Sequence, residues 1–169
     1  MKHIHFDTET DGFYGAYWQN KKAADSAIIA MLGDDAEDYM ARSAVKWLLK
    51  KGVNVLTMSP AKKNYSHHNY PLERIEKAIE WLLTHGNRKI GIAGASTTGT
   101  LALTAASYFS QITLTIAMTP SDLSGRDSSR GRKTVATNGR SRANRCFLIT
   151  ANRCRICRFA INIPNTGIS

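Results

Sequence analysis

The chain has 169 residues, with 23 basic and 13 acidic side chains and a formal net charge of +10. This length suits one domain with a real core, and a hydrophobic content of 43% fits a soluble globular protein. The apolar runs are far shorter than the roughly 20 residues that a membrane span needs. The N-terminus has no apolar stretch of the signal-peptide type. We therefore expect a cytoplasmic protein that does not engage a membrane.

The positive charge is concentrated toward the C-terminus. Residues 1–122 hold 13 Lys and Arg against 12 Asp and Glu, whereas residues 123–169 hold 10 against a single acid, Asp127. The first part uses mostly lysine and the second almost only arginine, and all three cysteines lie in the second. Two compositions meet near residue 123. We therefore treat 1–122 as the domain and 123–169 as a separate basic tail.

Residues 1–122 alternate between strand-like and helix-like segments. In chain order, apolar or alternating runs predict strands at 2–6, 12–19, 26–33, 53–59, 89–94 and 112–120, with a polar turn at 7–12. Amphipathic or small-residue runs predict helices at 35–52, 71–86 and 97–109. This alternation predicts an α/β fold with a mostly parallel, doubly wound sheet, made mixed by an antiparallel hairpin at its edge.

Two of the expected helices carry an apolar stripe at helical spacing. In residues 35–52 the stripe expected to face the sheet consists of Met40, Ala44, Trp47 and Leu48. In residues 71–86 it consists of Leu72, Ile75, Ala78, Ile79 and Leu82.

The glycine-rich stretch GIAGASTTGT, residues 91–100, joins a strand to a helix, where α/β proteins concentrate their chemistry. Gly94 and Gly99 have the spacing of a phosphate-binding loop, but Thr100 stands where that motif needs a lysine. The dinucleotide fingerprint is not present in register either. Phosphate binding is therefore disfavoured.

Two other interpretations of this turn stay open on its residues alone. A nucleophile elbow needs a serine at a strained turn, with small residues two positions before and two after it. Gly94 and Ser96 meet this, while Thr98 takes the second small position and Gly99 follows one later. Alternatively, Gly94 serves only the turn and Ser96 or Thr97 caps the helix.

The stretch from Gly91 to Asp122, with the preceding helix and the run AIIAMLGDD, resembles bacterial α/β-hydrolases of the acyl-CoA thioester hydrolase type. These are related to the C-terminal domain of bile-acid-CoA:amino-acid N-acyltransferase. The resemblance covers 1–122, about the first half of such a domain, and is most specific around Ser96. It implies an α/β-hydrolase-like sheet truncated after about its sixth strand. It also implies that Ser96 attacks an ester or acyl-CoA carbonyl to form an acyl-serine, without a cofactor.

The elbow interpretation also predicts an oxyanion hole. One donor would be the backbone N–H of Thr97, at a helix N-terminus where the dipole favours negative charge. The other would come from the loop after the strand at 26–33, at Gly33 or Asp34. The side chains of Asp34 and Asp35 are interpreted as charges near the N-terminus of the next helix.

The expected partners of Ser96 are missing in sequence order. Hydrolases of this fold place the acid and then the histidine after the nucleophile. Asp122 follows the last strand, where some hydrolases keep their acid, but every histidine precedes Ser96: His3, His5, His67, His68 and His85. The pair at 67–68 is interpreted as a solvated loop, so no metal site is expected. We expect this chain to be inactive or nearly so.

The tail at 123–169 allows two interpretations. One is a disordered basic extension that binds nucleic acid non-specifically, with Cys154 and Cys157 as half of a metal site. The other, which we favour, is a non-native sequence translated out of frame. Inserting one T after the Asp122 codon lets a permitted back-translation read DFVWEGFF, and the shifted frame restores acids, Trp and Pro. Two further functions remain as alternatives, a basic nucleic-acid-binding protein and a non-catalytic acyl-CoA-binding module.

Overall fold

The computed structural model describes residues 3–59, 70–120 and 146–150. The strands are β1 (Ile4–Phe6), β2 (Gly15–Trp18), β3 (Ser26–Met31), β4 (Asn54–Met58), β5 (Lys89–Ala95), β6 (Ile112–Met118) and β7 (Cys146–Thr150). The helices are α1 (Thr8–Asp11), α2 (Tyr39–Lys50), α3 (Glu73–Thr84) and α4 (Thr97–Tyr108). Among the described residues, no helix has the length and apolar character needed to cross a membrane.

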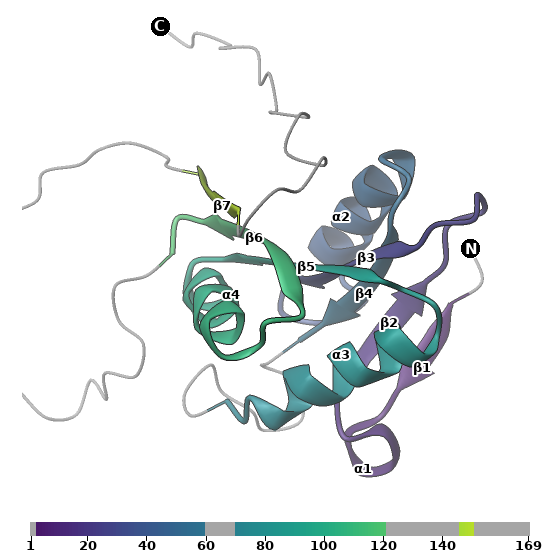
Figure 1. Cartoon of the computed structure of the whole chain (residues 1–169), viewed down its shortest axis with the longest axis horizontal. Coiled ribbons are helices and arrows are strands. Elements are labelled where there is room, and N and C mark those ends of the chain that lie inside the picture. Colours follow the sequence, from purple (N-terminus) through teal and green to yellow (C-terminus); the bar gives the residue numbers. More distant parts are fainter. Residues whose placement is uncertain (1–2, 60–69, 121–145, 151–169) are drawn as a thin grey trace, which may run out of the picture.

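One sheet contains all seven strands, in the order β1-β2-β4-β3-β5-β6-β7 (Figure 1). β3 lies between β4 and β5 and is parallel to both, and β6 is parallel to β5. β2 pairs antiparallel with β1 and β4, as the edge hairpin predicts. The expected mostly parallel, α/β-hydrolase-like sheet is confirmed. Because β3, β4, β5 and β6 run in the same direction, their carboxyl ends meet at one edge of the sheet.

The seventh strand lies beyond the part of the chain for which strands were predicted. β7 belongs to residues 123–169 and pairs antiparallel with β6, with Leu114 opposite Thr150 and Met118 opposite Cys146. The sheet is therefore mixed at both edges. The rest of the tail lies outside the described residues.

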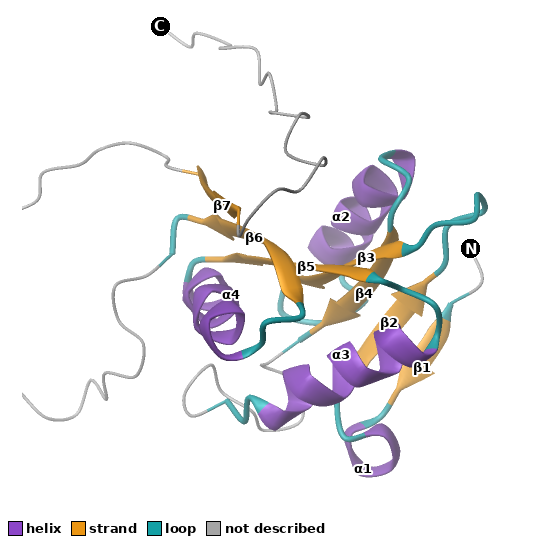
Figure 2. Cartoon of the chain, viewed as in Figure 1, coloured by secondary structure: helices purple, strands orange, loops and turns teal. Residues whose placement is uncertain are grey.

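Helices cover both faces of the sheet (Figure 2). α2 packs on one face, and α3 and α4 pack on the other. Within β3, Ile29 belongs to the core beneath α3 and α4, whereas Ile28 belongs to the core beneath α2. Successive side chains of a strand point to opposite faces, so a strand covered on both sides needs an unbroken apolar run. This explains the unbroken apolar composition of residues 27–31.

The predicted apolar stripe of α3 is confirmed. Ile75, Ala78, Ile79 and Leu82 are buried, and Leu72, just before the helix, is partly buried against the same core. Their recurrence every three or four residues keeps them on one side of the helix.

The predicted face of α2 is wrong by one position. Met40 is 59% exposed and Trp47 is 44% exposed, while Ala44 is only partly buried. The buried residues are instead Ala41, Val45 and Leu48. Both sets recur at helical spacing, and the smaller Ala41 and Val45 face the sheet while the larger Met40 and Trp47 face outward. Of the predicted stripe only Leu48 is buried.

The segment predicted as a polar turn at 7–12 contains the single-turn helix α1. Asp7 takes its N-cap position and accepts a hydrogen bond from Glu9 N–H at 2.9 Å. Gly12 ends the helix with a φ of 79°. An aspartate before a short helical turn and a glycine after it are the usual capping residues.

Candidate active site

Ser96 occupies the tight turn between β5 and α4, at the carboxyl edge of the parallel strands. Its φ is 53° and its ψ is −121°. Within the described residues, only Thr119 is another non-glycine residue with a positive φ. Holding a side chain in such a sparsely populated region costs about 1–3 kcal/mol, and residues of this kind cluster at functional sites. Ser96 is also exposed, so its hydroxyl has access to a ligand.

The Ser96 side chain does not cap α4, although Ser96 holds the N-cap position. Its N–H donates to Met118 O at 2.9 Å, and its carbonyl accepts from Thr100 N–H at 3.2 Å. These bonds fix the backbone of the turn and leave the hydroxyl out of the cap. Thr97 is the first residue of the helix and lies after the cap position. The capping interpretation therefore does not describe either side chain.

Gly94 lies where β5 passes against the first turn of α4. A Cβ on Gly94 would collide with the backbone carbonyl of Thr98. The φ of Gly94 is not positive, so the residue is needed for space rather than for its backbone conformation. Gly99 is in a less crowded position, since a Cβ there would lie 3.3 Å from both Gly94 O and Met118 O. The two glycines allow the helix to approach the strands closely.

Thr98, which departs from the expected small residue, fastens the turn to a neighbouring strand. It is buried, and its hydroxyl accepts a hydrogen bond from Ala95 N–H at 2.9 Å. The same oxygen lies 2.7 Å from Met31 O and 2.8 Å from Ala95 O, so its proton goes to one of these carbonyls. Met31 is the last residue of β3. The Thr98 side chain therefore connects the β5–α4 turn to the start of the loop that precedes α2.

That loop is organised by Asp38, the N-cap residue of α2. The Asp38 carboxylate accepts hydrogen bonds from Asp34 N–H at 2.7 Å, Asp35 N–H at 3.2 Å and Ala41 N–H at 2.8 Å. Partial burial raises the pKa of Asp38, but these backbone donors outweigh it and hold the pKa below its usual value. Gly33 has a φ of 116°, and a Cβ there would collide with the Asp38 carboxylate.

The hydrogen bond from Asp34 bears on the predicted oxyanion hole. The backbone N–H of Asp34, one of the two candidates for the loop donor, already donates to Asp38. The carbonyl of Asp34 accepts from the hydroxyl of Ser59, just after β4, at 2.7 Å. Neither Asp34 nor Asp35 lies in the first turn of α2. The sequence analysis missed Asp38, whose signal is an Asp three positions before Ala41 at a helix start.

The described histidines lie away from Ser96. His85 precedes β5 and so lies at the opposite end of that strand from Ser96. His3 and His5 belong to the segment of β1, and four strand spacings of about 4.8 Å, roughly 19 Å, separate β1 from β5. The remaining candidates lie outside the described residues: His67, His68 and Asp122.

One group of side chains with metal-ligating atoms close together is found among the described residues. It consists of His3, His5 and Glu37, and it lies at the β1 side of the sheet. The sequence analysis did not bring these residues together. The available signal was the alternation His-x-His in a predicted strand, which places both rings on one face.

Comparison with known protein families shows which family the chain belongs to. The family model described as BAAT / acyl-CoA thioester hydrolase C terminal matches residues 70–159, more than half of the chain. The chain belongs to this family. The match includes the Ser96 turn, and it continues past residue 122 through β7. The similarity to the acyl-CoA thioester hydrolase C-terminal family therefore extends into the basic tail that begins at residue 123.

Solved structures with a similar fold include the Pyrococcus furiosus esterase Pf2001 in two crystal forms. One has a TM-score of 0.56 at 20% identity and the other a TM-score of 0.57 at 23% identity, each over 70% of this chain. The chain spans about half the length of that esterase, 51% and 48% in the two structures. No curated protein sequence matches the chain significantly. The chain thus contains an α/β domain of the acyl-CoA thioester hydrolase C-terminal family, and it shares the fold of the esterase Pf2001.

Proposed function

We propose that this member of the acyl-CoA thioester hydrolase C-terminal family is a serine acyl hydrolase whose nucleophile is Ser96. The observation that carries the proposal is the exposed Ser96 hydroxyl on a backbone with φ 53° and ψ −121°, at the carboxyl edge of the sheet. The small ester and thioester substrates are inferred from the family and from the esterase Pf2001.

The chemistry consists of two acyl transfers. Ser96 Oγ loses its proton and bonds to the carbonyl carbon of the ester or thioester, and the alcohol or thiol leaves with a proton. Water then attacks the acyl-serine, and the carboxylic acid departs as Oγ regains a proton. The Oγ atom stands clear of the cap of α4, so no intrahelical hydrogen bond has to break before the attack.

The oxyanion of each step would be bound first by Thr97 N–H. Thr97 is the first residue of a 12-residue helix, where the N–H groups have no partner within the helix and the dipole is positive. A second donor from Asp34 would require its N–H to leave the Asp38 carboxylate. We therefore assign Thr97 the main role and the loop at Gly33 and Asp34 an auxiliary one.

We propose further that turnover by this 169-residue chain is slow. No described histidine lies near Ser96, and no histidine follows it in the sequence. A serine hydrolase without a general base positioned on Oγ typically loses about a hundredfold to ten-thousandfold in rate. An activated aryl ester, whose leaving group needs little protonation, is the suitable probe.

The test is to incubate the chain with a nitrophenyl ester and to locate the acyl group by peptide mass spectrometry. The acyl group is expected on Ser96. Ser96→Ala should remove it, whereas Ser107→Ala, which alters an exposed serine of the same helix, should leave it unchanged. An acyl group that maps elsewhere, or that survives Ser96→Ala at the same level, overturns the assignment. Saturable binding of an acyl-CoA without Ser96 acylation would instead identify a non-catalytic acyl-CoA-binding module.

A further inference from the structure

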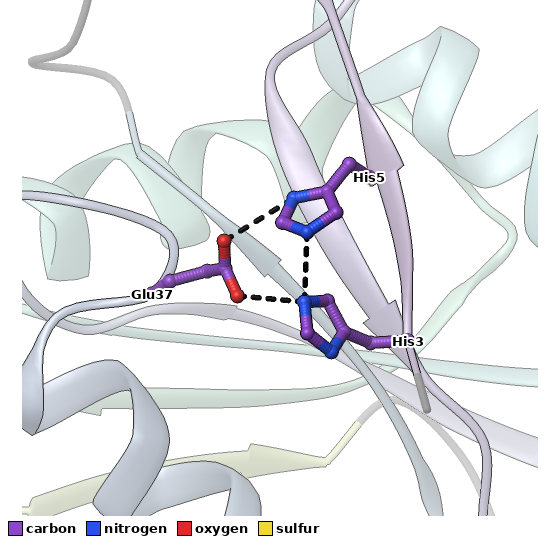
Figure 3. Close-up of side chains that lie close together, drawn as sticks. All are labelled: His3, His5 and Glu37. Carbon is purple, nitrogen blue, oxygen red and sulfur yellow. Dashed lines mark hydrogen bonds and ion pairs between the residues drawn. The ribbon is translucent and has the colours of Figure 1, made fainter. Parts of the chain in front are cut away.

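His3, His5 and Glu37 converge at a place remote from Ser96 (Figure 3). His3 Nε2 lies 2.8 Å from His5 Nε2 and 2.8 Å from Glu37 Oε1. His5 Nδ1 lies 3.2 Å from Glu37 Oε2. Both rings point toward the carboxylate, and the three side chains offer ligand atoms that all lie within 4.8 Å of one another.

The arrangement follows from the alternation of β1 and the position of the neighbouring loop. His3 and His5 are two residues apart, so their side chains share the face of the sheet that α2 covers. Phe6 points to the opposite face, into the core beneath α3 and α4. Glu37 belongs to the segment between β3 and α2 and approaches from the same side as α2. Two distant segments thus contribute two imidazoles and one carboxylate.

The hydrogen bonds of the cluster leave one acceptor without a partner. His5 Nδ1 lies within ion-pair distance of Glu37 Oε2, and His3 Nε2 and His5 Nε2 share one hydrogen bond whose donor depends on the tautomers of the two rings. Glu37 Oε1 is buried and receives no hydrogen bond, a condition shared among the described residues only by Thr8 Oγ1. His3 Nε2 at 2.8 Å and Arg42 Nη2 at 3.7 Å lie close to this oxygen without forming a hydrogen bond to it. A buried carboxylate oxygen without a hydrogen-bond donor is costly, and a cation bound directly to it would remove that cost.

We propose that His3, His5 and Glu37 form a binding site for a divalent transition-metal cation of the zinc class. Imidazole nitrogens and a carboxylate oxygen are ligands that zinc prefers. In a tetrahedral site with bonds of about 2.0–2.1 Å, the ligand atoms lie about 3.3 Å apart. His3 Nε2 lies 2.8 Å from both His5 Nε2 and Glu37 Oε1, and one ligand atom from each of the three residues lies within 4.8 Å of the others, so small side-chain shifts admit the ion. Three protein ligands leave a fourth position for water.

The surroundings hold the ligands in place. The His3 ring stacks on Trp18, with centroids 4.1 Å apart and an interplanar angle of 21°. Arg42 Nε donates to the backbone carbonyl of Glu37 at 2.8 Å, and its Nη2 lies 3.7 Å from Glu37 Oε1. These contacts orient the His3 ring and the Glu37 backbone, whereas the positive charge of the Arg42 guanidinium near Glu37 Oε1 lowers the affinity for a cation. The His5 side chain is 63% exposed, so an ion reaches the site directly from solvent.

The test is calorimetric titration of Zn²⁺ into the full-length chain in which Cys146, Cys154 and Cys157 are replaced by Ser. These replacements remove the thiolates of the tail as competing ligands. One saturable site per chain is expected. His5→Ala and Glu37→Gln should each weaken binding about tenfold or more, the range typical even of lost supporting contacts. Since His5 is exposed and Gln preserves the shape of Glu37, a folded chain is expected in both cases.

Two matched variants separate this site from other histidines. His85→Ala removes an exposed histidine that stacks on Trp81, and it should leave Zn²⁺ affinity unchanged. The double change of His67 and His68 to Ala should do the same. The proposal is overturned if the Cys-free chain shows no saturable binding, or if His5→Ala and Glu37→Gln bind as tightly as the Cys-free chain.

Discussion

Replacing Thr98 by Val tests whether the β5–α4 turn is held by the Thr98 hydroxyl. Valine preserves the branched shape of threonine and removes only the oxygen. That oxygen accepts from Ala95 N–H at 2.9 Å and lies 2.7 Å from Met31 O in a buried position. The substitution therefore takes a donor and an acceptor away from two backbone groups without opening a cavity.

The expected cost follows from those two groups. A buried polar group that loses its partner costs about 1–3 kcal/mol, and a carbonyl with a second lone pair costs less than an N–H. Loss at Ala95 N–H and at the carbonyl that takes the Thr98 proton, Met31 O or Ala95 O, should together lower the free energy of unfolding by about 2–3 kcal/mol. That is a large share of the roughly 5–15 kcal/mol that stabilises a typical domain.

The assay is urea unfolding of Thr98→Val beside Thr104→Val, a matched change on the same helix. The Thr104 hydroxyl donates only to Thr100 O, four residues earlier, at 3.0 Å. Such back-bonding contributes little, so this control should stay within about 0.5 kcal/mol of the parent chain. If the two variants lose the same free energy of unfolding, and the slope of that free energy against urea concentration is the same in both, the role assigned to Thr98 is refuted.

Two further predictions concern the same region. Gly94→Ala should cost several times more free energy of unfolding than Gly91→Ala. A Cβ on Gly94 would collide with the Thr98 carbonyl, whereas a Cβ on Gly91 would lie at an ordinary 3.4 Å from its neighbours. Equal decreases in the melting temperatures of the two variants would contradict this. Asp38→Ala should cost about 0.5–2 kcal/mol at pH 7. Since the folded-state pKa of Asp38 is lowered, that difference should shrink as the pH falls below about 3.9; melts that keep the full gap at pH 2 would refute it.

The order and type of the elements could be predicted because the signals are local. Unbroken apolar runs mark β3 and β5 as strands covered on both faces, and the apolar stripe of α3 fits one helical face. The face of α2 could not be predicted, because two overlapping sets of residues share the same spacing. Which set is buried depends on the size of the gap between helix and sheet, and only the packed structure supplies that size.

The candidate site was predictable in its location and not in its contacts. Gly94 and Ser96 mark a sharp strand-to-helix turn in the sequence, and the fold places that turn at the carboxyl edge. The hydrogen bond between Asp34 and Asp38 depends on how the loop closes over α2, which no short motif encodes. The meeting of His3 with Glu37 joins segments 34 residues apart and depends on the antiparallel docking of β1. The interpretations of the tail stay predictions.

The position of Thr98 explains how this strand-to-helix turn accommodates a larger residue than the nucleophile-elbow pattern has at that place. The small-residue requirement at such a turn comes from the close approach of helix and strand. Gly94 meets it here, because a Cβ at this position would collide with the backbone of Thr98 rather than with its side chain, and Gly99 gives further room. The Thr98 side chain turns away toward Met31 and gains a hydrogen bond that glycine could not make. Met31 and Asp34 flank the same loop, and Asp38 holds its other end. The serine and the loop facing it are therefore fixed relative to each other by two polar side chains, Thr98 and Asp38, and weakening either should disturb the geometry of both.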